Sequence, residues 1–453
     1  MNLGPYRDES PPSRQRLANG AVLLTVPVPA AQALALGVWM RLGTQDEPPG
    51  LGGLSHFLEH IVFKGSVTRS AYDLAQAFDA VGAAVDAFST KDHVAFTVKV
   101  LPEYFETAAG LLADMLLRPA LDPEMIALEQ EVVCEEIQEA SDTPEDRLHD
   151  AFAARVYGAH PRSRPILGSR ESVLGFDAGV LRREHARVFA GPNLVVALAG
   201  ALPRGAPDRL ASLFGEAPPG EAPPSAAAGA GSAPSETAAA AAAATAAAAA
   251  AAGKPAAAGL APAPSPPPPA GGRLELKSPI VQTYFEFGNL ACSYRDADRI
   301  PLFVLANILG GGMSSRVFQA VREREGLAYT VYTYNDMGRD TGLVSCAGSC
   351  SPGKAARLEK VVREEYARLL REGVAEDELA NNRAQIKSQL IFSLEGVTNQ
   401  MSRAAKNEIF YGRFVPVAEL VDQIDGLDRR ALARCAAAYF DPARLVIATH
   451  GPA

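Results

Sequence analysis

Five consecutive residues, His56-Phe57-Leu58-Glu59-His60, carry the clearest chemistry in the sequence. In a helix, His56 and His60 lie one turn apart on one face, and Glu59 lies beside them because positions three residues apart also overlap. Two neutral imidazoles in this arrangement can bind one zinc ion, and a carboxylate can act next to it. The segment therefore predicts a metal site whose general base is built into the same helix.

A catalytic zinc site needs a third protein ligand and one open position, so a further ligand must come from elsewhere in the chain. The best source is a predicted helix at residues 122–156, which carries four carboxylates between Glu129 and Glu136. These two residues are seven positions apart and lie two turns apart on one face. The residues alone leave open which of them binds the metal and which supports it as a neighbouring carboxylate.

Simpler interpretations apply to most other residues of these types. Glutamate-rich helices are commonly solvated, and we assign Glu131, Glu135 and Glu139 to a solvated face. The remaining five histidines stand alone in the sequence and are predicted to be structural: His93, His149, His160, His185 and His450.

The elements that must position these residues occur in the same order twice. Predicted strands lie at 21–26, 35–42, 84–101 (interrupted by the polar turn 89–93), 193–198, 280–287, 328–334 and 342–348. Predicted helices lie at 71–81, 103–117, 122–156 with a break near 141–144, 178–188, 301–309, 353–372 and 375–411. We predict an α+β protein of two duplicated domains, each a mainly antiparallel sheet with helices on one face.

Composition separates the two halves. Residues 216–272 are dominated by alanine, proline and glycine and are predicted to be a low-complexity linker. We therefore expect an N-terminal zinc-binding catalytic domain at 1–215 and a C-terminal homologous domain at 273–453.

Charge and apolar content exclude several classes of protein. The net charge of -9 argues against a nucleic-acid-binding protein, which needs a basic face. No apolar run approaches the roughly 20 residues of a membrane span, and the first twenty residues lack the apolar core of a secretory signal. Five scattered cysteines indicate a reducing compartment. Together with the alanine and proline content, these features predict a cytoplasmic, bacterial protein.

The sequence resembles the insulinase and pitrilysin family of zinc peptidases, in a short form similar to mitochondrial processing peptidase and its bacterial relatives. The segment His56 to His60 has the family's His-x-x-Glu-His order, the inverzincin pattern. Segments 164–168 and 310–316 are also similar to family patterns. The resemblance implies that Glu136 is the third ligand of one Zn²⁺ per subunit and that Glu129 supports the site.

A second pair of residues is indicated by the resemblance alone. Arg322 and Tyr329 match the spacing of the arginine and tyrosine with which the family holds substrate and stabilises the oxyanion. A cation and a phenol are suitable donors to a carbonyl oxygen that becomes negative. Asp86 departs from the family, where many relatives have asparagine on the strand that binds substrate. An aspartate lacks the amide donor, although backbone pairing would remain.

The function implied is a zinc metalloendopeptidase that hydrolyses unfolded peptides or presequence-like segments inside a chamber, with Glu59 as general base. The resemblance also implies a homodimer, or a heterodimer with a related subunit. The alternative is a non-catalytic partner subunit or a peptide-capturing protein of the same fold.

Overall fold

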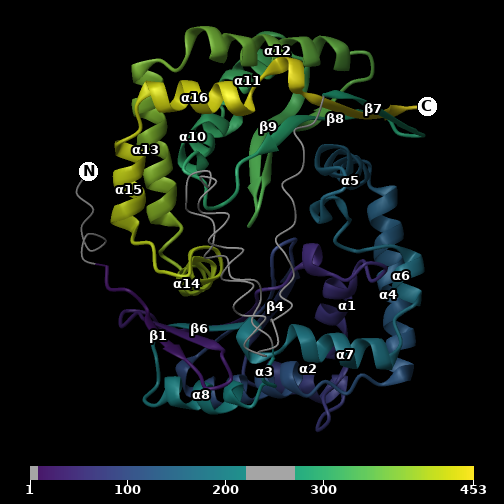
Figure 1. The fold of residues 1–453 in the computed structure, drawn as a ribbon, viewed down its shortest axis with the longest axis vertical. Helices are drawn as coiled ribbons and strands as arrows, with labels where there is room; N and C mark the ends of the chain where they lie inside the picture. The colour runs from purple at the N-terminus through teal and green to yellow at the C-terminus, as the bar shows by residue number, and fades with distance from the viewer. Residues whose placement is uncertain (1–8, 221–270) are drawn as a thin grey trace, which may run out of the picture.

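Two β-sheets form the centre of the molecule, one in each half of the chain (Figure 1). The computed structural model describes residues 9–220 and 271–453, so most of the predicted linker lies outside the described residues. The first sheet has the order β1-β2-β6-β3-β5-β4, and its strands are Ser13–Arg16 (β1), Val22–Pro27 (β2), Leu34–Met40 (β3), Ala84–Ser89 (β4), Val94–Val100 (β5) and Leu194–Gly200 (β6). The second has the order β7-β11-β8-β10-β9, and its strands are Gly272–Ser278 (β7), Thr283–Ala291 (β8), Ala328–Met337 (β9), Gly342–Cys350 (β10) and Val446–Pro452 (β11).

The two sheets share one topology. Strands β2-β6-β3-β5-β4 correspond in order to β7-β11-β8-β10-β9, and the last strand of each half lies between the first two of that set. In both sheets the first of these pairs is parallel, whereas the following pairs are antiparallel. The predicted duplication and the mainly antiparallel α+β architecture are therefore confirmed.

The main helical layer of the first half packs on one face of its sheet. Its helices are Leu54–Ile61 (α1), Ala71–Ala80 (α2), Phe105–Leu117 (α3), Pro123–Asp142 (α4), Arg170–Leu174 (α6), Ala178–Val188 (α7) and Ala206–Gly215 (α8). Fully buried side chains such as Val38, Phe96 and Leu112 join the sheet to this layer. Successive side chains of a strand point to opposite faces, so Leu36 of β3 belongs to this core, whereas its neighbour Ala35 belongs to a cluster on the other face of the sheet.

A corresponding layer covers the second sheet. Its helices are Arg299–Gly310 (α10), Arg316–Phe318 (α11), Ala355–Glu372 (α12), Glu376–Phe392 (α13), Val417–Asp425 (α15) and Arg429–Tyr439 (α16). Phe287, Leu305 and Val362 are among the buried residues of this second core.

The opposite face of each sheet is covered by a helix that belongs to the other half of the chain (Figure 1). Helix α5 (Pro144–Tyr157) packs on β8 and β11, where Phe152 is fully buried. Helix α14 (Val397–Tyr411) packs on β2, β3 and β6, where Met401 is fully buried beside Trp39. The two halves thus exchange one helix each.

The prediction of one long helix over residues 375–411 is wrong. The structure has α13 and α14, which are separated at residues 393–396. Helix α13 has its C-cap at Ser393, and Gly396 lies in an extended conformation at the N-cap of α14. Only the second helix lies on the first sheet, so the break allows the chain to move from one half to the other.

Several elements were not predicted, among them β1, β7, α6, α8, α11, α15 and α16. Strand β7 begins at Gly272, the last residue of the predicted linker. Within the part of the chain that the structure describes, no helix is both long enough and apolar enough to cross a membrane.

Candidate metal centre and active site

Helix α1 presents the histidine motif, and a tight backbone junction fixes where this helix begins. Gly53 precedes the first helical residue with φ of 86°, a left-handed conformation that favours glycine. A Cβ atom there would lie 2.4 Å from the carbonyl oxygen of Leu167, so only glycine permits this approach. The buried Glu47 carboxylate accepts hydrogen bonds from the backbone N–H groups of Gly53 and Ser55, at 2.9 and 2.7 Å. The close approach to Leu167 explains the glycine that directly precedes helix α1.

Three side chains converge at one point beside α1. His56 Nε2 lies 3.2 Å from His60 Nε2, and Glu136 Oε2 of α4 lies 3.7 Å from the former and 3.6 Å from the latter. All three ligand atoms lie within 4.8 Å of one another. Zinc–nitrogen bonds of about 2.0–2.1 Å in a tetrahedral site place neighbouring ligand atoms about 3.3 Å apart. The donor set and its spacing therefore fit a zinc ion.

The protonation of the two histidines differs. Burial, together with the neighbouring His60, lowers the pKa of His56 to about 4, so this imidazole is neutral near pH 7, as a metal ligand must be. Burial also acts to lower the pKa of His60, but the hydrogen bond to Glu129 and the nearby carboxylates outweigh it and raise that pKa. A metal ion binds the neutral imidazole, so it competes with a proton at each histidine. This competition is stronger at His60 than at His56.

Glu129 supports the site and is not among the three converging ligands. Its Oε1 accepts a hydrogen bond of 2.8 Å from Nδ1 of His60, which directs the other ring nitrogen of His60 toward Glu136. Its Oε2 pairs with Lys64 Nζ at 2.6 Å. Burial would raise the pKa of Glu129, but the hydrogen bonds from His60 and Lys64 outweigh it and lower the pKa. The carboxylate is thus held ionised behind the histidine.

Glu59 lies on the same helix but is not part of the converging ligand set. Ser89 Oγ at the end of strand β4 donates a hydrogen bond of 2.5 Å to Glu59 Oε2. Burial raises the pKa of Glu59, which is the direction expected of a group that accepts and returns protons near neutral pH. Asp86 lies exposed on the same strand, and β4 is the edge strand of its sheet.

Arg322 and Tyr329 contact each other but lie away from the metal centre. The guanidinium Cζ of Arg322 lies 4.5 Å from the centroid of the Tyr329 ring, and Tyr329 is 79% exposed. Arg322 belongs to a π-helical turn, Gln319–Arg324, that follows α11, whereas α1 lies in the other half of the molecule (Figure 1). The structure therefore brings this pair together but does not bring it to the histidines of the same chain.

Sequence reasoning missed three residues around the site, which are Glu47, Lys64 and Ser89. Lys64 lies four residues after His60, so its position one turn further along the chain could have been noticed. Glu47 and Ser89 come from a loop and from a strand, and only the folded structure brings them to α1.

Comparison with known proteins adds an independent observation. Residues 22–170 match the family described as Insulinase (Peptidase family M16), and residues 175–386 match the Peptidase M16 inactive domain. The chain is 31% identical over 415 residues to the uncharacterized zinc protease YmxG of Bacillus subtilis (strain 168), a match that covers 92% of each protein. The chain belongs to peptidase family M16. YmxG and another relative of this M16 protein, ML0855 of Mycobacterium leprae (strain TN), which is 33% identical over 420 residues, are both named uncharacterized zinc proteases.

Solved structures agree on the fold of the M16 chain. A protease from Helicobacter pylori superposes with a TM-score of 0.83 and 17% identity, over 97% of this chain and 99% of that one. A peptidase M16 inactive domain from Pseudomonas fluorescens superposes with a TM-score of 0.81 and 19% identity, over 98% of both chains. At these identities the likeness concerns the fold alone.

Proposed function

We propose that this M16 protein is a zinc endopeptidase that hydrolyses peptide bonds in unfolded peptides or presequence-like segments. The observation that carries the proposal is the convergence of His56, His60 and Glu136, with the non-ligating Glu59 on the same helix. These three residues would hold the ion. Bound zinc supplies Lewis acidity, which makes water nucleophilic at neutral pH and polarises the scissile carbonyl.

The protein's own residues would then move the protons. Glu59 accepts a proton from the attacking water and returns it to the leaving amine nitrogen, and its burial raises its pKa, which favours uptake of the proton. Ser89 holds one oxygen of Glu59 and leaves the other free for water. Glu129 fixes the ring orientation of His60. No covalent link between protein and substrate is needed.

The edge strand β4 is the proposed place where substrate backbone binds. It pairs with β5 on one side, and its other edge has no strand partner within the described residues. An extended peptide can add to such an edge through main-chain hydrogen bonds. Ser89 on this strand contacts Glu59, so a peptide paired with β4 would pass beside the general base.

Zinc analysis and peptide cleavage test the proposal together. The purified protein is expected to contain one zinc per chain and to cleave a quenched peptide library, and a chelator should abolish cleavage. Glu59→Gln should retain zinc but lose activity by about 10²-fold or more, because the base is absent. Stoichiometric zinc without turnover of any library peptide would favour the alternative, a non-catalytic subunit or a peptide-capturing protein.

We further propose that the active unit is a dimer, either of two copies or with a related subunit, and that it acts in the bacterial cytoplasm. This would let Arg322 and Tyr329 of one subunit face the metal centre of the other, since they lie away from it in their own chain. Mixing Arg322→Ala chains with Glu59→Gln chains should restore activity, because one site per mixed dimer is then intact. No recovery in isolated mixed dimers would refute a shared site.

A further inference from the structure

Glu47 is a buried acid that contacts the start of the metal-binding helix. Its residue is 4% exposed, and it forms no ion pair within the described part of the chain. Its two carboxylate oxygens instead accept backbone N–H groups, one from Gly53 and one from Ser55. Because the N-cap residue of α1 is a glycine, no side chain at the N-cap itself can accept hydrogen bonds from the first turn. Glu47 therefore takes the place of the missing N-cap side chain.

The loop that carries Glu47 is itself fixed on two sides. The backbone N–H of Thr44 donates to the carbonyl oxygen of Thr90, in the turn between β4 and β5, at 3.0 Å. Asp46 pairs with Arg339 of the second half at 2.6 Å. Because its neighbours are attached to other elements, Glu47 can hold α1 in place instead of moving with it.

The two histidines of the metal centre differ in what orients their rings. Nδ1 of His60 donates a hydrogen bond of 2.8 Å to Glu129. Nδ1 of His56 is buried and has no hydrogen-bond partner among the described residues. A ligating histidine usually donates its second ring N–H to a partner that fixes the ring. The orientation of His56 therefore depends on the backbone of α1, and His56 directly follows Ser55, whose N–H is bound by Glu47.

Stability does not explain an acid at this position. Burial raises the pKa of Glu47 to about 7, although the hydrogen bonds from Ser55 and Gly53 act in the opposite direction. The folded protein thus binds a proton at Glu47 more tightly than the unfolded chain does, so stability falls as the pH rises from 4.5 to about 7. Above pH 7 the ionised carboxylate opposes folding. A residue that lowers stability while it holds a ligand-bearing helix is typical of a functional position.

We propose that Glu47 is the positioning residue of His56, and that it acts through the first turn of α1 as Glu129 acts directly on His60. It holds the imidazole of His56 where that ring can bind zinc together with His60 and Glu136. The inference rests on the zinc chemistry of the proposed function. It concerns a residue that is not a ligand, so its replacement should change the metal affinity while all three ligands remain in the chain.

The zinc affinity of the full-length, metal-free protein tests the proposal. Zinc alone is titrated at pH 8 in competition with a zinc-sensitive dye. Glu47→Gln keeps the size of the side chain but turns an amide N–H₂ group toward a backbone N–H. It should lower the zinc affinity about tenfold, the lower end of the range for partners of ligating histidines.

A conservative variant and a measurement of folding accompany this change. Glu47→Asp keeps the charged acceptor and should retain more of the zinc affinity than Glu47→Gln does. Far-UV circular dichroism and urea unfolding of the metal-free variants verify the fold. A loss in Glu47→Asp as large as in Glu47→Gln would contradict the role of the carboxylate.

A double-mutant cycle shows whether Glu47 acts through His56. In the His56→Ala background, Glu47→Gln should cause no further loss of zinc affinity, because the residue that it positions is absent. Glu129→Gln should still lower the affinity in that background, because His60 remains. A further loss of about tenfold from Glu47→Gln there would show a general effect on the site and would overturn the proposal.

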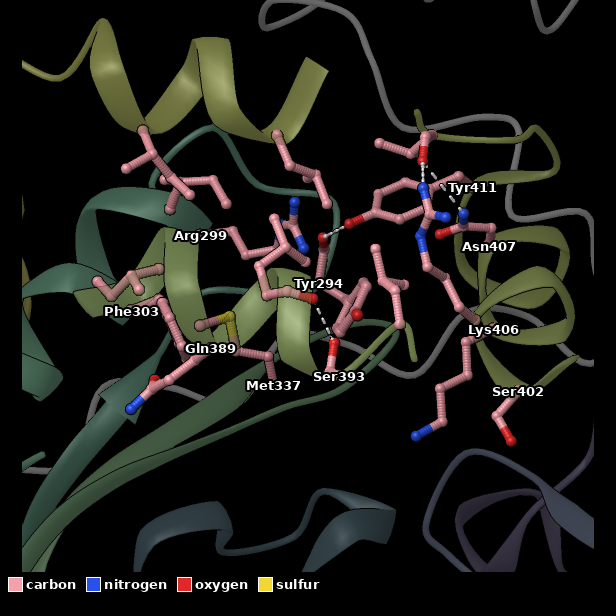
Figure 2. Close-up of a pocket in the computed structure, with 18 of the residues that line it drawn as sticks. Tyr294, Arg299, Phe303, Met337, Gln389, Ser393, Ser402, Lys406, Asn407 and Tyr411 are labelled. Carbon is pink, nitrogen blue, oxygen red and sulfur yellow. Dashed lines mark hydrogen bonds between the residues drawn. The ribbon is translucent and has the colours of Figure 1, made fainter. Parts of the chain in front are cut away.

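Two control variants remove hydrogen bonds elsewhere. Asp177 accepts the N–H of Val180 at 2.7 Å and caps α7, a helix of the same half that carries no ligand. In a groove of the second half, Tyr411 donates to the carbonyl oxygen of Tyr294 at 3.5 Å (Figure 2). Asp177→Asn and Tyr411→Phe should leave the zinc affinity unchanged. A loss equal to that of Glu47→Gln in either control would contradict the proposal.

The zinc titration also separates this proposal from the proposed function. Equal zinc affinity of Glu47→Gln and the unmodified protein would overturn the role of Glu47 and leave the metal centre intact. Absence of zinc binding by the unmodified protein would overturn both.

Discussion

At the scale of single residues, the metal centre shows how much the spacing of side chains could predict. The positions of His56, Glu59 and His60 on one helical face follow from the period of the helix alone. The choice between Glu129 and Glu136 does not, because both lie on one face of α4. The structure places Glu136 nearest the two ring nitrogens and Glu129 behind His60. That distinction depends on how α4 crosses α1, which no local pattern encodes.

Replacing Glu129 tests its supporting position. Glu129→Gln keeps the size of the side chain but removes the charge that pairs with Lys64 and His60. Zinc affinity is expected to fall about 10- to 100-fold, as for other partners of ligating histidines. Competition with a zinc-sensitive dye measures the zinc affinity. Glu131→Gln, at an exposed position two residues along, should leave the affinity unchanged; an equal loss there would show a general charge effect instead.

Acid should weaken the structure through His93. This residue is buried against Phe88 and Phe410, and burial lowers its pKa to about 4. The unfolded chain binds this proton near pH 6.5, so the contribution to stability is complete above pH 6.5 and is lost as the pH falls toward 4. The loss is about 3 kcal/mol. Urea unfolding at a series of pH values from 7 to 4 measures this loss in the free energy of unfolding.

The comparison variant for this pH dependence is His93→Phe, which cannot be protonated. Its free energy of unfolding should fall less on acidification than that of the unmodified protein. Parallel pH curves for the two proteins would show that other groups cause the acid sensitivity.

At the scale of elements, most helices and strands followed from their apolar periods, whereas their packing partners did not. The period of residues 397–411 predicts a helix with one apolar face, but it does not say which sheet receives that face. The structure shows that α14 packs on the sheet of the other half. Elements with few apolar residues, such as β1, were missed because their strand pairing is determined by a distant partner.

Truncating the apolar face of α14 tests this packing. Met401 is fully buried in the cluster that joins α14 to the first sheet. Met401→Ala is expected to lower the free energy of unfolding by about 2–5 kcal/mol, because it leaves a cavity. Chemical denaturation provides the measurement. Met313→Ala removes the same atoms from a side chain that is 77% exposed and should cost far less; similar losses would argue against close packing of α14.

At the scale of the whole molecule, ion pairs join the two halves beside the exchanged helices. The buried Arg162 donates to Asp92 of the first half at 2.8 Å and to Asp336 of the second at 3.0 Å. Arg339 pairs with Asp46 across the same junction at 2.6 Å. Because the exchanged helices and these ion pairs join the two halves, the halves form one structure.

Removing the buried arginine should destabilise the entire molecule. Arg162→Met leaves Asp92 buried beside fewer partners, at a cost of about 3–5 kcal/mol. Calorimetry should show one transition that shifts to lower temperature as a unit. Arg209→Met, which breaks the exposed pair with Glu106, is the control and should cost about 0–1 kcal/mol. Two separate transitions would contradict the coupling of the halves.

The exchange of helices also has a consequence for synthesis on the ribosome. The first sheet has all its strands once β6 has been made, yet α14, which covers its second face, follows about 200 residues later. At a synthesis rate of roughly 5–20 residues per second, α14 is made roughly 10 to 40 s after β6. During this interval the nascent chain presents Trp39 and its apolar neighbours to solvent. The growing polypeptide is therefore expected to depend on a holding chaperone until α14 emerges.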